Sequence, residues 1–263
     1  MAVEAIDQFM NISRGTVFVR TWRPEEASKV PIVLLHDSLG SVELWRDFPE
    51  ALAAATGRSV IAYDRLGFGK SSIRTDPAVP EFVDDEARTY FPAIVKSLGL
   101  SQYVLFGHSV GGGMALASAS ISGDSCVAVI TESAQAFVEE RTLSGIRAAK
   151  QSFENEAQLS RLSKWHGERA RWVLEAWTEV WLSPRFREWS LDHYLGKVIC
   201  PVLAIHGDSD EFGSSEFPHR ITQGVSGPAR MKILNECGHV PHREKEADVL
   251  SLVCSFLFEN QVP

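Results

Sequence analysis

The sequence predicts an α/β fold: a mostly parallel central sheet flanked by helices, with an inserted helical cap. Short apolar runs typical of buried strands alternate with helical segments, which is the pattern of a parallel sheet covered on both faces. The alternation stops between residues 134 and 195, where the chain is helical in pattern and poor in strands. Ligands of open sheets bind beyond the carboxyl ends of the strands, so a site is expected in the loops there.

The length and composition fit one such unit. The 263 residues, 44% hydrophobic and 23% charged, are enough to bury a large core. We expect residues 1–133 and 196–263 to form the α/β core and residues 134–195 to form the cap.

The chain opens with a predicted edge hairpin. Residues 9–12 and 16–22 are apolar runs separated by Ser13-Arg14-Gly15, which is typical of two antiparallel strands. Pro24 then ends the second strand, because proline cannot continue a sheet ladder.

Two buried strands are predicted next, one on each side of a helix. Residues 32–35 and 59–63 are short apolar runs. Between them, apolar residues from 44 to 55 recur at helical spacing, and Gly57 follows as a stop signal. The glycines in residues 64–72 predict a loop after the second strand.

A helix with an internal proline is predicted over residues 84–98. Its acidic start and the stop signal at Gly99 favour a helix, but Pro92 lies inside it. We expect either a kink at Pro92 or a helix that begins there.

The remaining expected elements complete the sheet. Residues 127–130, 202–205 and 231–234 are apolar runs typical of strands, and residues 247–258 form the predicted closing helix. With a further strand at 103–106, described next, the loops that follow these strands meet at one edge of the sheet.

Ser109 lies on a tight turn between the expected strand 103–106 and an expected helix, 112–119, in the stretch Gly107-His108-Ser109-Val110-Gly111. Such a turn strains its central residue, and glycines two residues before and after relieve the crowding. The Ser109 hydroxyl is then exposed at the edge of the sheet. The Val110 amide, at the helix start, can donate to a developing oxyanion. This is the context of a nucleophile elbow.

A serine hydroxyl needs a base to take its proton and an acid to orient that base. Two later strand ends offer both groups. The loop after 202–205 contains Asp208 and Asp210, and the loop after 231–234 contains His239, with His242 close behind. Asp208 is the weaker candidate acid, since residues nearest a strand end are often turn formers.

These motifs resemble those of the α/β-hydrolase superfamily, and the resemblance covers nearly the whole chain. It rests on His36-Asp37-Ser38-Leu39-Gly40, residues 64–72, Gly107 to Gly111, Gly207-Asp208-Ser209-Asp210 and Gly238-His239. It implies a catalytic triad of Ser109, Asp210 and His239. In some relatives the acid follows the strand after the elbow, which keeps Glu132 as an alternative.

The resemblance also implies an oxyanion hole formed by the backbone N–H groups of Ser38 and Val110. This sequence departs from the family at Asp37, where glycine is usual. Aspartate tolerates unusual backbone angles better than most residues, so the loop can be kept. Its carboxylate would either lie near the site or point away and tie down its own loop.

The expected cap carries five of the seven tryptophans, which makes it the natural source of pocket walls. Trp177 and Trp181 are four residues apart and would share one helix face. We expect Trp165, Trp177 and Trp181 to line the substrate pocket together with His108 of the elbow. Such a pocket favours a small apolar or aromatic compound.

The predicted function is that of a serine hydrolase that cleaves a small apolar or aromatic ester or lactone through an acyl-enzyme. One alternative is hydrolysis of an activated carbon–carbon bond, as in enzymes that resemble the meta-cleavage product hydrolases. A second, of a different class, is a ligand-binding or cofactor-free member of the fold without hydrolytic activity.

Charge and residue usage exclude other classes. A net charge of −8 without a clustered basic stripe disfavours nucleic acids and anionic membranes as partners. No CxxC pair marks a zinc site, and the proposed chemistry needs no metal or organic cofactor. The absence of a signal pattern or a long apolar run predicts a cytoplasmic protein that acts on a small-molecule substrate. The oligomeric state stays open.

Overall fold

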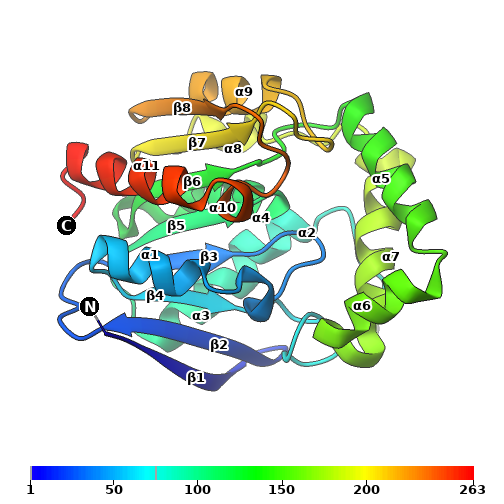
Figure 1. Cartoon of the computed structure of the whole chain (residues 1–263), viewed down its shortest axis with the longest axis horizontal. Coiled ribbons are helices and arrows are strands. Elements are labelled where there is room, and N and C mark those ends of the chain that lie inside the picture. Colours follow the sequence, from blue (N-terminus) through cyan, green and yellow to red (C-terminus); the bar gives the residue numbers. More distant parts are fainter. Residues whose placement is uncertain (1, 75) are drawn as a thin grey trace.

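The computed structural model describes residues 2–74 and 76–263 and contains an eight-stranded sheet (Figure 1). The strands are β1 (Val3–Ile12), β2 (Gly15–Pro24), β3 (Ile32–Leu35), β4 (Val60–Tyr63), β5 (Tyr103–His108), β6 (Cys126–Glu132), β7 (Val202–Gly207) and β8 (Ala229–Leu234). Their order in the sheet is β1-β2-β4-β3-β5-β6-β7-β8. The strands β3 to β8 pair in parallel, while β2 joins both β1 and β4 antiparallel. The predicted mostly parallel sheet is therefore confirmed.

The edge hairpin is longer than predicted. β1 and β2 pair along ten residues each. Charged side chains in the added part, Glu4 and Asp7, form ion pairs across the hairpin with Arg23 and Arg20. These residues interrupt the apolar pattern, so the sequence alone pointed only to the half nearest the turn.

Helices cover both faces of the sheet, as predicted. They are α1 (Phe48–Thr56), α2 (Phe82–Asp85), α3 (Phe91–Leu98), α4 (Val110–Ser122), α5 (Glu140–Ser152), α6 (Glu156–His166), α7 (Ala170–Trp181), α8 (Asp192–Leu195), α9 (Glu216–Gly224), α10 (Pro241–Glu244) and α11 (Glu246–Glu259). Within the described ranges, none of them is both long enough and apolar enough to cross a membrane.

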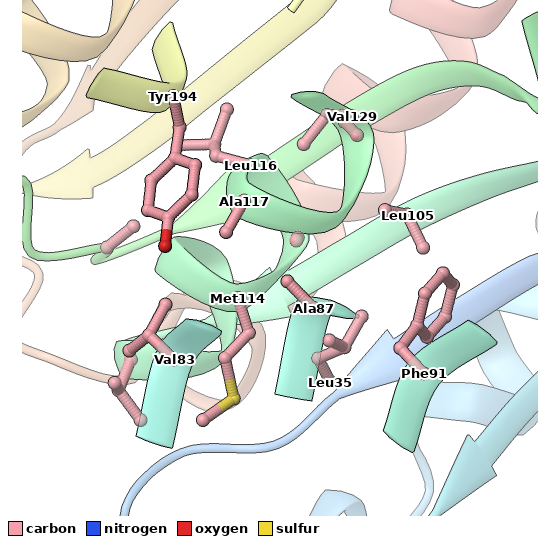
Figure 2. Close-up of a cluster of buried hydrophobic side chains, with 14 of the residues drawn as sticks. Leu35, Val83, Ala87, Phe91, Leu105, Met114, Leu116, Ala117, Val129 and Tyr194 are labelled. Atoms are coloured by element: carbon pink, nitrogen blue, oxygen red, sulfur yellow. The ribbon is translucent and has the colours of Figure 1, made fainter. Parts of the chain in front are cut away.

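Each face of the sheet has its own hydrophobic core. α1 and α11 pack on one face, and α3, α4, α8 and α9 pack on the other. Side chains alternate between the two cores along each strand, so that Leu34 belongs to the first and Leu35 to the second. Figure 2 shows the second core, which brings together Leu35 and Leu105 of the strands, Phe91 of α3 and Met114 of α4. This packing fixes the sheet edge from which the site is built.

The first helix begins later than predicted. Instead of one helix over residues 44–55, a 3₁₀ turn at Val42–Trp45 precedes α1, which starts at Phe48. Arg46 has a φ of 54°, a left-handed conformation that cannot continue a helix. α1 ends at Gly57, which takes a φ of 66° as a left-handed cap.

Pro92 lies inside a helical run that is unbroken from Phe82 to Leu98. It lies in the first turn of α3, and a π-helical turn at Glu86–Tyr90 joins α3 to α2. Proline lacks an N–H and its ring clashes with a preceding carbonyl, so the ladder must change spacing before it. The helical run thus begins before Pro92, at Phe82, and the π-helical turn accommodates the proline, so neither predicted outcome describes it fully.

Helices α5 to α8 fill the stretch between β6 and β7 that the sequence predicts as a cap. Figure 1 shows α5, α6 and α7 side by side at the right of the sheet. α8 instead packs on α4 and α9, over the sheet. The cap boundaries of 134 and 195 stay a prediction.

Gly111 packs against the backbone of β3, and this contact gives a test of the fold. A Cβ atom at residue 111 would lie 2.1 Å from the Leu35 carbonyl oxygen, too close for any side chain. We expect Gly111→Ala to lower the free energy of unfolding by about 3 kcal/mol or more. Gly196, which has open space around it, is the control. Urea denaturation should place Gly196→Ala within about 1 kcal/mol of wild type, and an equal loss in both variants would contradict the packing argument.

Candidate active site

Ser109 lies on the sharp turn from β5 into α4. Its φ of 55° and ψ of −128° are rarely adopted by residues with a side chain. Two hydrogen bonds hold this conformation. The Ser109 N–H donates to the Glu132 carbonyl oxygen at 2.8 Å, and the Gly112 N–H donates to the Ser109 carbonyl oxygen at 2.9 Å. The backbone thus has the strained geometry that the sequence predicts for an elbow.

His239 and Asp210 lie beside the Ser109 side chain. Nε2 of His239 is 3.0 Å from Ser109 Oγ, and Nδ1 of His239 is 2.9 Å from each carboxylate oxygen of Asp210. The carboxylate also accepts the Phe212 N–H at 2.8 Å. With the Nδ1–H of His239 donating to Asp210, Nε2 carries a lone pair directed at the hydroxyl. The arrangement can move a proton from Ser109 to His239.

The pKa values of the acid and the base move in opposite directions. Burial alone would lower the pKa of His239, but the hydrogen bond to Asp210 and its negative charge outweigh burial and raise it. Burial alone would raise the pKa of Asp210, but the hydrogen bond from His239 and the neighbouring imidazoles lower it. Asp210 therefore stays ionised and stabilises a protonated His239.

The other candidate acids and bases do not reach Ser109. Asp208 is exposed and accepts the Ser209 hydroxyl at 2.8 Å. Glu132 and His242 pair with each other, with 2.5 Å between Glu132 Oε2 and His242 Nδ1. Of the alternatives that the sequence left open, the geometry brings Asp210 and His239 to Ser109 and leaves these three aside.

His108 lies behind the site and not in the pocket wall, which corrects the sequence prediction. It is 3% exposed, and its Nε2–H donates to the His239 carbonyl oxygen at 2.8 Å. Burial lowers the pKa of His108 to about 4, so the ring is neutral. His108 therefore supports the loop that carries His239.

His108, Glu132 and His242 also form the one group in the described ranges whose candidate metal-ligand atoms all lie within 4.8 Å of one another. The short hydrogen bond between Glu132 and His242 already uses one carboxylate oxygen and one ring nitrogen. We assign no metal to this group.

The predicted oxyanion loop follows β3. In the described chain, the N–H groups of Ser38 and Val110 have no hydrogen-bond partner, which leaves both free to donate. Asp37 is not among the residues with a positive φ, so this position does not require glycine. Its Oδ1 lies only 2.1 Å from where a Cβ of Gly40 would be, and its Oδ2 is 3.9 Å from His108 Nδ1. The carboxylate therefore folds back over its own loop.

A cavity of about 740 Å³, open mouth included, lies beside Ser109 and His239. Trp177 and Trp181 of α7 line it, on one helix face as their spacing predicts. Trp165 does not: it lies on α6 with the Lys164 ammonium 4.9 Å from its ring, which corrects its predicted place in the pocket. The remaining walls are mostly apolar and include Ile146, Ala149, Phe153 and Phe212.

Two further polar residues touch the triad and were missed by sequence reasoning. Gln135, in the loop after β6, places both atoms of its side-chain amide 3.3 Å from Ser109 Oγ. His206, at the end of β7, has Nε2 3.5 Å from Asp210 Oδ2. The position of His206 two residues before Asp208 could have indicated its role, whereas no motif marks Gln135.

Comparison with known proteins adds to this geometry. A family model described as the alpha/beta hydrolase fold matches residues 30–194, more than half of the chain. A 2-hydroxymuconate semialdehyde hydrolase of Pseudomonas sp. (strain CF600) is 27% identical over 265 residues, covering 92% of this chain and 91% of that protein. The (lyso)-N-acylphosphatidylethanolamine lipase of Bos taurus is 35% identical over 103 residues, 39% of this chain.

The bovine lipase match spans only 30% of the length of that relative. Among solved structures, the enol-lactonase from Burkholderia xenovorans LB400 superposes with a TM-score of 0.75 at 16% identity, over 95% of this chain and all of that one. At such low identity the superposition supports the fold alone.

Proposed function

The chain belongs to the alpha/beta hydrolase fold family, and from this premise we propose that it is a hydrolase that cleaves carboxylic esters or lactones through a Ser109-linked acyl-enzyme. In this mechanism His239 accepts the Ser109 proton as Oγ attacks the carbonyl carbon, while Asp210 orients His239. The backbone N–H groups of Ser38 and Val110 hold the oxyanion. Protonated His239 then releases the leaving group and activates the water that hydrolyses the acyl-enzyme.

One observation carries the proposal: the continuous hydrogen-bond chain from Asp210 through His239 to Ser109, with contacts of 2.9 Å and 3.0 Å. A serine hydroxyl in ordinary surroundings has no such base, and its backbone is not strained. Both features together are what nucleophilic catalysis by serine requires.

The cavity supports a small apolar or aromatic substrate. Trp177, Trp181, Phe153 and Phe212 bring four aromatic side chains to the wall of this cavity. Rings of this kind bury and orient a flat or apolar group. No cofactor takes part in the proposed steps, since every proton and electron pair is moved by the three side chains.

A second candidate reaction is hydrolysis of a carbon–carbon bond. It is favoured by the similarity to the 2-hydroxymuconate semialdehyde hydrolase, which extends over 92% of this chain. The same nucleophile, base and oxyanion hole would serve, because an activated ketone also presents a carbonyl carbon to Ser109. Product analysis with a vinylogous diketone acid and with aryl esters separates the two reactions.

Labelling with a fluorophosphonate tests the proposal. We expect one adduct on Ser109, found by intact mass and peptide mapping, that is absent in Ser109→Ala and much weaker in His239→Ala. A folded wild-type protein that stays unlabelled, and that hydrolyses neither short-chain nor aryl esters, would overturn the proposed function.

The activity should depend on pH through His239, which accepts a proton only when neutral. Its pKa is raised above the usual 6.5 by Asp210, so kcat/KM should be full well above pH 6.5 and fall as the pH drops through the raised value. The check is kcat/KM for an aryl acetate from about pH 5 to about pH 9. An inflection below 6.5 would contradict the pairing of His239 with Asp210.

A further inference from the structure

Arg65 is a buried arginine without a carboxylate partner. Its side chain is 6% exposed, yet no Asp or Glu oxygen of the described residues lies within 4.0 Å of its nitrogens. Burial lowers the pKa of Arg65, and the nearby charges of Glu86 and Asp37 offset this effect only in part.

The contacts of the guanidinium leave part of it unsatisfied. One nitrogen donates to the Asp37 carbonyl oxygen at 2.7 Å, and Nε donates to His36 Nε2 at 3.3 Å. The other terminal nitrogen has only the Met114 sulfur, at 3.5 Å, which is a weak acceptor. The Phe68 ring covers one face, 4.4 Å from the guanidinium carbon. A guanidinium offers five N–H donors, so acceptors are missing on the Met114 side.

That side faces a second cavity, of about 590 Å³ with its open mouth, which Arg65 and Met114 both line. The second cavity shares Ser38, Trp177 and Trp181 with the cavity beside Ser109. The two cavities are therefore adjacent, and a substrate held at Ser109 would reach Arg65 by passing these shared residues.

The two cavities differ in charge. Beside Ser109 the acidic residues Asp37 and Glu211 line the wall, and no lysine or arginine does. The second cavity has the two guanidinium groups of Arg65 and Arg74 and one carboxyl group, that of Glu86. A negative group on a ligand is repelled from the first cavity and attracted into the second.

The other charged groups of the second cavity are already paired. Arg74 pairs with Asp76 at 2.6 Å. Glu86 accepts the Tyr63 hydroxyl at 2.6 Å, and burial raises the pKa of Glu86. Arg65 is the cation whose N–H groups on the Met114 side still lack an oxygen acceptor.

We propose that the substrate carries a carboxylate remote from its scissile bond, and that Arg65 binds this carboxylate in the second cavity. The inference rests on the proposed ester hydrolysis at Ser109. The substrate class is thus an ester or lactone of an acid or alcohol that ends in a carboxylate, with an apolar section between Trp177 and Trp181. A guanidinium holds a carboxylate through two parallel hydrogen bonds, which suits this task.

Matched ester pairs test the proposal. On the acyl side, the para-nitrophenyl monoesters of adipate and suberate are compared with para-nitrophenyl hexanoate and octanoate, which have equal chain lengths. On the alcohol side, para-acetoxybenzoate is compared with para-methylphenyl acetate. We expect kcat/KM of wild type to favour the carboxylate ester about tenfold or more in at least one pair, after correction for spontaneous hydrolysis.

Variants of Arg65 then test whether this residue causes the preference for the carboxylate ester. Arg65→Met should lower the preference about 10-fold to 100-fold, mainly through KM of the carboxylate ester, and Arg65→Lys should restore part of it. Arg230→Met, which removes an exposed arginine on β8, is the control and should keep the preference. Competition by free adipate and suberate against fluorophosphonate labelling should weaken in Arg65→Met.

The outcomes separate the inference from the function on which it rests. Neutral esters preferred in every pair, or an equal loss of kcat for both members of a pair in Arg65→Met, would overturn the anion site and leave ester hydrolysis intact. The second result would mean that Arg65 only holds the oxyanion loop through the Asp37 carbonyl. Absence of turnover and of Ser109 labelling would instead overturn the proposed function itself.

Discussion

Replacement of Ser109 by alanine is expected to lower kcat for aryl esters by about 10⁴-fold or more, to the level left by the oxyanion hole and binding alone. The hydroxyl is the atom that attacks in the proposed mechanism, and its proton goes to His239 at 3.0 Å. The measurement is steady-state hydrolysis of para-nitrophenyl acetate with the protein's melting temperature recorded alongside. Alanine, like serine, has a Cβ atom and meets the same backbone strain at this positive φ. The substitution therefore adds no strain, and the fold should persist.

Ser118 offers the matched control for Ser109. It is a fully buried serine of α4 whose hydroxyl has no hydrogen-bond partner among the described residues. Ser118→Ala should keep kcat within about twofold of wild type, because an unsatisfied hydroxyl is lost at little cost. Retention of kcat in Ser109→Ala would show that the serine is not the nucleophile.

Asp210→Asn is expected to lower kcat by about 10³-fold to 10⁴-fold. Asparagine keeps the size of the side chain but removes the charge that raises the pKa of His239. It can also donate a hydrogen bond to Nδ1, which favours the tautomer of His239 with the proton on Nε2. That tautomer cannot accept the Ser109 proton.

Asp208→Asn is the control in the same loop, because Asp208 is exposed and contacts Ser209 instead of His239. Its kcat should stay within about twofold of wild type. A larger loss of activity in Asp208→Asn than in Asp210→Asn would transfer the role of the acid to Asp208.

The strand cores and the order of elements were predictable because they depend on local apolar runs. The stretch 32–35 coincides with β3, and the predicted ranges 103–106 and 202–205 lie inside β5 and β7. The predicted element boundaries were wrong where an interaction other than apolar burial determines them. Charged pairs across the hairpin extend β1, and the left-handed Arg46 delays α1. Neither leaves an apolar pattern in the sequence.

The candidate site divides in the same way. Ser109, Asp210 and His239 follow strand ends within three residues of a glycine, so motif spacing was enough to nominate them. The loop residue Gln135 touches Ser109 only because β6 pairs with β5 and brings its loop alongside. His108 and Trp165 lie near the expected pocket in sequence, but their side chains turn away from it. Such directions depend on tertiary packing, which spacing does not encode.

The group formed by His108, Glu132 and His242 has a consequence for proton linkage. In the folded protein the hydrogen-bonded pair of Glu132 and His242 holds one proton between its two members, whichever carries it. When the chain unfolds between about pH 4.5 and about pH 6.5, a free carboxylate and a free imidazolium together also hold one proton. The pair therefore neither releases nor binds a net proton on unfolding. Its contribution to the free energy of unfolding does not change with pH in that range.

Of the three residues, only His108 makes the free energy of unfolding depend on pH in this range. Burial lowers its pKa to about 4, so unfolding binds one extra proton between that value and the ordinary 6.5. A group with a lowered imidazole pKa costs stability as the pH falls, here about 1.4 kcal/mol per pH unit. Urea titrations at successive pH values should show this slope reduced by about that amount in His108→Gln. The three buried titratable groups behind the triad thus take up only one net proton on unfolding.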